Sequence, residues 1–123
     1  MPNKNYVRGF AAEKRCIDDL QKAGYFAQRN HASKGCYDIV AVGKGMVRFI
    51  EVKRSKKPVR KTESVENKYE MSLSALNEIP DQKGTVKELW LWVDKEGIAG
   101  EKKYQPAHWE KFVVTRNGFH RRK

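Results

Sequence analysis

Two acidic side chains lie in an apolar stretch that otherwise predicts a β-hairpin. Residues 37–53 read YDIVAVGKGMVRFIEVK, with Asp38 in the first apolar segment and Glu51 in the second. A two- or four-residue turn centred on Lys44 and Gly45 places Asp38 directly opposite Glu51, whereas a three-residue loop does not. Opposite positions bring Cβ atoms to about 4.5–5.5 Å, where like charges destabilise the strand pair. The pairing therefore needs a compensating positive charge.

Lys53 is one candidate for that charge. The side-chain period of two predicts that one face of the second segment carries Val47, Phe49, Glu51 and Lys53. In most proteins an E-x-K triplet of this kind is a salt bridge on a wet sheet face. The triplet alone is weak evidence of a functional site.

Glu13 adds a third carboxylate. It shares a helical stripe, which we expect to be buried, with Phe10, Ile17 and Leu20. A carboxylate on a buried stripe needs a partner, because an isolated buried charge is costly. One interpretation is an ion pair at the helix edge with Arg8 or Arg29; the other is convergence with the two hairpin acids.

Three carboxylates and a lysine at one sheet edge predict a divalent-metal site that also holds a phosphodiester. Mg²⁺ binds in such sites through one or two carboxylates, water and phosphate oxygens. The cation would offset the repulsion between Asp38 and Glu51. The lysine would position or deprotonate the attacking water and offset phosphate charge.

The elements that must position these residues follow from apolar periodicity and turn residues. We expect a single domain over residues 1–123 with an α/β fold, in which a small mixed central β-sheet is flanked by helices. The expected segments are a loose leader at 1–6, helices at 7–23 and 71–79, strands at 25–30, 37–43, 46–53, 87–94 and 111–116, a basic loop at 54–68, and a basic tail at 117–123. Ser72 or Ser74 is the expected N-cap of the second helix. The strand at 87–94 is apolar on both faces, as in the middle of a covered sheet.

Composition favours a nucleic-acid partner. The 123 residues include 26 Lys and Arg against 15 Asp and Glu, for a formal net charge of +11. Such a charge attracts a phosphate backbone. The sequence has no apolar run of transmembrane length, no secretory signal and no glycine-rich nucleotide loop, so we expect a cytoplasmic protein with no membrane and no nucleotide cofactor. In that compartment Cys16 and Cys36 are expected to be free thiols.

Short motifs in this order resemble the PD-(D/E)XK nuclease superfamily. They are G-x-x-x-E at Gly9 and Glu13, S-K-G-x-x-D-I-V-A at residues 33–41, and E-V-K at residues 51–53. Together with the R-G-F-A-A-E segment and the A-G-Y that follows the first helix, they resemble the archaeal-type Holliday junction resolvases, which also occur in phages and viruses. The family's proline before the aspartate is Tyr37 here. The resemblance implies a restriction-endonuclease-like core and a location in an archaeal or virus-infected cell.

The resemblance also implies roles for individual residues. The metal, Mg²⁺ with Mn²⁺ as a substitute, would be held by Asp38, Glu51, the Val52 backbone carbonyl and Glu13, directly or through water. Lys53 would serve the nucleophilic water, and Ser33 occupies the family's loop-serine position. The expected DNA contacts come from Arg8, Arg29, Lys34 and the basic loop, with Arg54, Lys56, Lys57, Arg60 and Lys61. Ser33, Arg8 and Arg29 are equally consistent with a turn-forming hydroxyl and two solvated arginines.

Family members are homodimers that nick opposing strands of a four-way junction and leave a 5′-phosphate and a 3′-hydroxyl. The aromatic residues of 87–94, with Trp109 and Phe112, are candidates for a dimer surface or for the core. Two other functions remain open. One is a superfamily nuclease that cuts duplex or single-stranded DNA, and the other is a non-catalytic DNA-binding module whose acids form a structural salt-bridge network.

Overall fold

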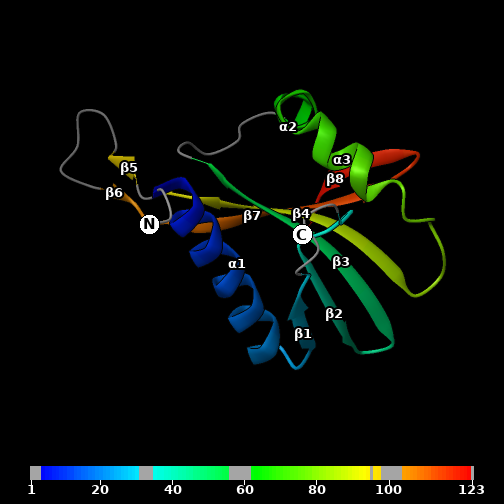
Figure 1. The fold of residues 1–123 in the computed structure, drawn as a ribbon. Coiled ribbons are helices and arrows are strands. Elements are labelled where there is room, and N and C mark those ends of the chain that lie inside the picture. The colour runs from blue at the N-terminus through cyan, green and yellow to red at the C-terminus, as the bar shows by residue number, and fades with distance from the viewer. Residues whose placement is uncertain (1–3, 31–34, 56–61, 95, 98–103, 123) are drawn as a thin grey trace.

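A six-stranded mixed sheet forms the centre of the molecule, and helices lie on both of its faces (Figure 1). The computed structural model describes residues 4–30, 35–55, 62–94, 96–97 and 104–122. The helices are α1 (Lys4–Lys22), α2 (Thr62–Lys68) and α3 (Glu70–Leu76). The strands are β1 (Phe26–Arg29), β2 (Ile39–Gly43), β3 (Met46–Ser55), β4 (Thr85–Val93), β5 (Glu96–Gly97), β6 (Tyr104–Gln105), β7 (His108–Thr115) and β8 (Gly118–Arg121). The predicted α/β fold is confirmed.

The strand order explains why the sheet is mixed. It runs β1-β2-β3-β4-β7-β8, and β5 and β6 form a separate two-stranded pair. Only β3 and β4 are parallel, because α2 and α3 connect them across one face, and the other neighbours in the sheet are antiparallel. The predicted hairpin register is also confirmed, since Gly43 pairs with Met46 and Ile39 with Ile50.

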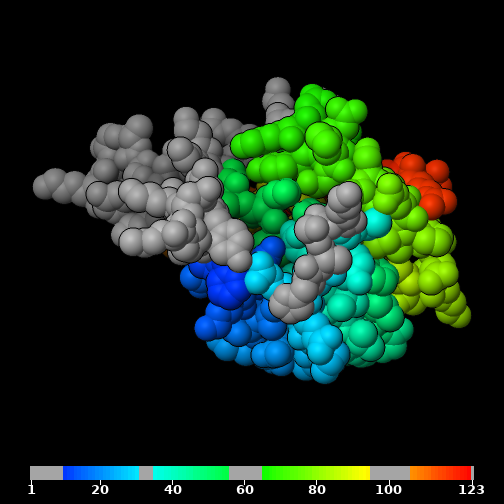
Figure 2. Space-filling view, in the orientation of Figure 1, coloured from blue at the N-terminus to red at the C-terminus, as the bar shows by residue number. Residues whose placement is uncertain are grey.

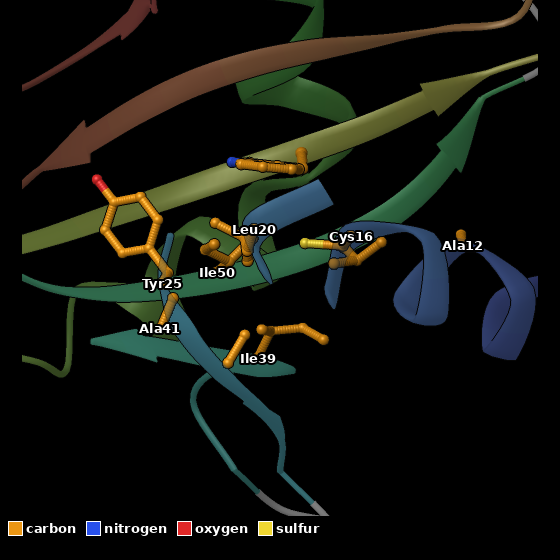
Figure 3. Close-up of a cluster of buried hydrophobic side chains, with 10 residues drawn as sticks. Ala12, Cys16, Leu20, Tyr25, Ile39, Ala41 and Ile50 are labelled. Carbon is orange, nitrogen blue, oxygen red and sulfur yellow. The ribbon is translucent and has the colours of Figure 1, made fainter. Parts of the chain in front are cut away.

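Helix α1 packs one apolar core against the sheet (Figure 3). Its buried residues recur every four positions, at Ala12, Cys16 and Leu20. They meet inward-facing strand residues that include Ile39 and Ile50. Cys16 is fully buried as a small packing residue, and both cysteines are free thiols.

The expectation that Phe10 belongs to the buried stripe is wrong. Phe10 is largely exposed, and Ile17 is only partly buried. Helix α1 is rotated about its own axis relative to the expected stripe, so that Ala12, Cys16 and Leu20 face the sheet. Glu13 consequently lies at the margin of the contact.

A second core fills the opposite face of the sheet, beneath α2 and α3. It contains Val65, Leu76, Leu89, Leu91, Phe112 and Val114. The alternation along β4 sends Leu89 and Leu91 to this core and Trp90 to the α1 core, which confirms that this strand is covered on both faces. The same alternation in β3 places Phe49 on the α2–α3 side and Ile50 on the α1 side.

The aromatic residues considered for a dimer surface or for the core all pack within the protomer, to different depths. Trp90 and Phe112 are buried, and Trp92 and Trp109 pack partly buried against the α1 core. Trp109 forms edge contacts with Trp90 and Trp92 and donates its Nε1 hydrogen bond to Asp19 of α1 at 2.7 Å. Trp90 and Phe112 are therefore core residues, and the role of the exposed parts of Trp92 and Trp109 in a dimer surface stays a prediction.

Several segment boundaries differ from the expected ones because short elements extend into polar sequence. Residues 4–6 are helical rather than a leader, and the expected basic loop is strand at 54–55 and helix at 62–68. The expected tail contains β8, which pairs with β7. The expected helix at 71–79 is α3, which begins at Glu70 after Tyr69, so Ser72 and Ser74 lie inside it and neither is the N-cap. No helix in the described part of the chain is long and apolar enough to span a membrane.

A buried ion cluster links the strands on the α1 side. Arg48 of β3 makes a two-pronged contact with Glu88 of β4, with nitrogen–oxygen distances of 2.6 and 2.8 Å. Glu88 is fully buried and also accepts from Trp90 Nε1 and pairs with Arg122 near the end of the chain. These partners hold the pKa of Glu88 below its usual range despite burial. Arg122 thereby ties the C-terminal strand to the centre of the sheet.

Replacing Arg48 by Met should lower the free energy of unfolding by about 3 kcal/mol, because it leaves a buried carboxylate short of a partner. Arg54→Met is the matched control, since Arg54 lies on the same strand and pairs with Asp94 at the half-exposed surface. Its expected cost is about 0–1 kcal/mol. Urea unfolding of both variants measures the difference, and equal costs would contradict a structural role for the buried cluster.

Candidate active site

The candidate site lies where β2 stops and β3 continues. The ladder between them ends at Ile39 and Ile50, while β3 remains paired with β4 through Ser55. Asp38 precedes the first paired residue of β2, and its backbone N–H donates to the Ile50 carbonyl at 2.9 Å. Among the described residues, no strand pairs with the β2 side of β3 beyond this point, so this side of β3 is free of strand partners there.

The Asp38 carboxylate accepts a hydrogen bond that β2 would accept if it continued beside β3. Its Oδ2 accepts a hydrogen bond from the Val52 backbone N–H at 2.8 Å. In an extended strand the N–H and C=O of one residue point to the same side. The Val52 carbonyl therefore faces the same open side as Asp38, as a backbone metal ligand must.

Asn30 fixes the chain that leads into Asp38. Its backbone N–H donates to the Asp38 carbonyl at 2.7 Å, and its side-chain amide donates to the Tyr37 carbonyl at 3.0 Å. A Cβ at Gly35 would lie 2.0 Å from Asn30 Nδ2, so a larger residue there would displace the Asn30 side chain from Tyr37. Asn30 was not predicted from the sequence, and the nearby S-K-G motif is the one signal that could have suggested it.

The side chains of Glu51 and Lys53 project from β3 on the same face of the sheet as Phe49. They lie beside Asp38, at the part of β3 that has no β2 partner. Glu51 is 9% exposed, and its Oε1 lies 3.7 Å from Lys53 Nζ. Burial, together with a hydrogen bond to Asp38 and the charge of Asp38, raises the pKa of Glu51 to about 8. Lys53 opposes this rise without cancelling it. Two carboxyl groups therefore share a site that holds too little positive charge for both to ionise freely.

Glu13 approaches this cluster from α1, on the other side of the sheet. Its Oε2 lies 2.6 Å from Arg29 Nε at the end of β1. Burial and, secondly, the charge of Asp38 raise the pKa of Glu13, while Arg29 and Lys53 lower it. The ion pair is the one that the helix-edge interpretation predicted, yet the pKa shift also records that Glu13 senses Asp38 and Lys53. Near the centre of Figure 2, surface atoms of α1 (blue), β1 (light blue) and β3 (green) lie next to one another.

The donor set fits a hard divalent cation. Two carboxylates, from Asp38 and Glu51, and the Val52 carbonyl are all oxygen donors, and Mg²⁺ requires no more protein ligands than these. Within the described residues, no three or more His, Cys, Asp and Glu side chains form a group that could hold a metal ion. Glu13, paired with Arg29, is therefore better suited to act through water than as a direct ligand.

Two of the eight other predicted site residues lie in the described part of the chain. Arg8 belongs to α1, and Arg54 pairs with Asp94 rather than standing free at the surface. Six predicted residues lie outside the described part of the chain: Ser33, Lys34, Lys56, Lys57, Arg60 and Lys61. Their assigned roles stay predictions.

Comparisons with known proteins agree with this fold. The chain resembles Archaeoglobus fulgidus Hjc, a Holliday junction resolvase from an archaeal hyperthermophile, with a TM-score of 0.52 and 23% identity over 87% of this chain and 73% of that one. No curated protein matches the sequence. The structural likeness and the mixed sheet define the restriction-endonuclease-like α/β fold, as expected.

The sequence itself matches a family model described as archaeal Holliday junction resolvase over residues 4–72, which is more than half of the chain. The matched region includes α1, β1, β2 and β3. It therefore contains the acidic cluster, which consists of Glu13, Asp38 and Glu51. This protein belongs to the archaeal Holliday junction resolvase family.

The Glu51 pKa predicts how the stability of the metal-free protein depends on pH. Because the folded-state pKa is raised from 4.5 to about 8, the contribution of Glu51 is fully present below about pH 4.5 and is lost as the pH rises through 8. In EDTA, wild type and Glu51→Gln should melt alike near pH 5. Near pH 9 the melting temperature of wild type should be lower by several degrees, since about 1 kcal/mol moves it by about 4 °C in a domain of this size.

Thermal unfolding across pH 5–9 measures this difference. Glu66→Gln on α2, which removes an exposed carboxylate, is the control and should follow wild type throughout. A constant gap between wild type and Glu51→Gln would mean that Glu51 does not titrate near pH 8.

Proposed function

We propose that this protein resolves four-way DNA junctions by hydrolysing one phosphodiester in each of two opposing strands, with a divalent metal ion. The observation that carries the proposal is the pair of carboxyl groups at Asp38 and Glu51, held together at the open end of β3 and only partly neutralised by Lys53. A purely structural role would be better served by neutral side chains at these positions. Family membership supports a junction as the substrate.

The metal that fits this site is Mg²⁺, with Mn²⁺ as a substitute. Asp38, Glu51 and the Val52 carbonyl would hold it, and Glu13 would act on its water. When bound, such an ion supplies Lewis acidity and lowers the pKa of a water molecule that serves as nucleophile.

The protein's own groups prepare the phosphate and the water. The Lys53 side chain is 42% exposed. It can therefore reach a phosphate oxygen while its Nζ stays 3.7 Å from Glu51 Oε1. There it would offset the charge that develops on the phosphate and hold or accept a proton of the attacking water. Arg29 lies beside the same acids, paired with Glu13. Among the arginines that the structure describes, it is the one best placed to contact the DNA backbone.

A second candidate is a DNA-binding module in which the acids are part of a salt-bridge network. The ion pair between Glu13 and Arg29 favours it, since it satisfies one of the three acids without a metal. A third is a nuclease of the same fold that prefers duplex or single-stranded DNA. The net charge of +11 promotes DNA binding in all three cases, so affinity alone does not discriminate among them.

Cleavage of an end-labelled four-way junction beside a linear duplex of the same sequence tests the proposal. Wild type with Mg²⁺ should make paired, symmetric nicks in the junction only, and EDTA should abolish them. Asp38→Asn should lower the cleavage rate by more than about 100-fold, because even the outer-shell partners of metal ligands cost roughly 10- to 100-fold when removed.

Asp18→Asn is the matched control, because Asp18 is an exposed aspartate of α1. This variant should cleave the junction at the wild-type rate. Equal cutting of duplex and junction would favour the general nuclease. Junction binding without cuts, in Mg²⁺ and in Mn²⁺, would leave the non-catalytic module as the function.

We also infer that the active species is a homodimer, because one acidic site serves one strand and resolution needs two opposing cuts. Light scattering on the eluting protein should give twice the chain mass at the concentration used for cleavage. A monomer that still makes paired nicks would contradict this inference.

A further inference from the structure

Phe10 is a large aromatic side chain that the fold leaves at the edge of the candidate site. It is 45% exposed, although the residues two and six positions along α1, Ala12 and Cys16, are buried. Glu13 follows it by three residues and so lies on the same side of the helix. The ring therefore stands beside an acid of the cluster rather than in the core.

Arg29 connects the two. Its guanidinium carbon lies 4.6 Å from the centre of the Phe10 ring, and its Nε lies 2.6 Å from Glu13 Oε2. The arginine thus has an aromatic face on one side and a carboxylate on the other. Its side chain is 26% exposed, so it remains accessible to a ligand from solvent.

The two contacts differ in what a nucleic acid can replace. A phosphate oxygen is an anion like the Glu13 carboxylate and can take its place on the guanidinium, since arginine binds both in the same way. A phosphate cannot replace the ring, because the guanidinium carbon lies over the aromatic face, where an anion has no equivalent to offer. The cation–π contact therefore limits the rotamers of the long Arg29 side chain while its anionic partner changes.

We propose that Phe10 is a positioning residue for the substrate: its ring holds the Arg29 guanidinium at the acidic cluster, where Arg29 pairs with Glu13 in the free protein and with a DNA phosphate in the complex. The exchange brings the phosphate to the cluster and releases the Glu13 carboxylate to bind water there. This inference rests on the proposed nuclease function.

The test is a double-mutant cycle between Phe10 and Arg29, read by junction cleavage and by junction affinity in EDTA. Phe10→Leu should raise KM by about two- to tenfold, because an Arg29 side chain that the ring no longer holds must be ordered when DNA binds. The kcat should stay within about twofold, because the ring positions Arg29 equally in the substrate complex and in the transition state. Phe10→Tyr, which keeps an aromatic face, should restore the wild-type KM. In the Arg29→Ala background, Phe10→Leu should have no further effect.

The matched control is Phe26→Leu, because Phe26 is 63% exposed and lies at the opposite end of β1 from Arg29. It should leave KM and affinity unchanged. A separate readout is the NMR shift of the Arg29 side-chain N–H, which the Phe10 ring should displace in wild type and in Phe10→Tyr but not in Phe10→Leu.

A wild-type KM in Phe10→Leu would overturn the inference. So would a Phe10→Leu effect that persists in full without Arg29, since Phe10 would then act on DNA or on the fold by itself. Absence of wild-type cleavage would refute the proposed function instead. In that case the junction affinities in EDTA and the NMR shift still decide whether Phe10 positions Arg29. An affinity coupling between the two residues, together with a ring-dependent shift of the Arg29 N–H, supports the inference. The absence of either overturns it.

Discussion

The site depends on one unfavourable contact, the approach of Asp38 and Glu51 at the end of a strand pair. Asp38 is held by the Val52 N–H and by the Ile50 carbonyl, so it cannot swing away from Glu51 without breaking backbone hydrogen bonds. Glu51 is nearly buried and has Lys53 as its counter-ion at 3.7 Å. The fold therefore holds two carboxyl groups at a fixed place where added positive charge would stabilise both ionised forms, and the proposed divalent cation would supply that charge.

The rest of the fold keeps that contact rigid. Two apolar cores clamp the sheet from both faces, so β3 cannot shift relative to β4 without disturbing both. The buried pair of Arg48 and Glu88 joins the same two strands, and Arg122 extends the link to the last strand. The positions of the Glu51 side chain and the Val52 carbonyl are therefore set by this central pair of strands.

Sequence patterns predicted the parts of the site that depend on local geometry. The hairpin register follows from turn position and a period of two, which is why Asp38 and Glu51 were expected to meet. The same reasoning misplaced Phe10, because helical periodicity gives the relative positions of residues but not the rotation at which a helix docks. The pairing of Arg48 with Glu88 was not foreseen, since it depends on a parallel register set by a crossover about thirty residues long, which no turn rule fixes.

The most direct test of the central claim is the number of protons released when Mg²⁺ binds. Calorimetric titration near pH 7, in two buffers of different ionisation enthalpy, gives that number. With a Glu51 pKa of about 8, wild type should release close to one proton per metal ion, and Glu51→Gln should release none while binding more weakly. Mg²⁺ binding without proton release, or equal release from the variant, would contradict the claim that the carboxyl pair is held in place for a cation.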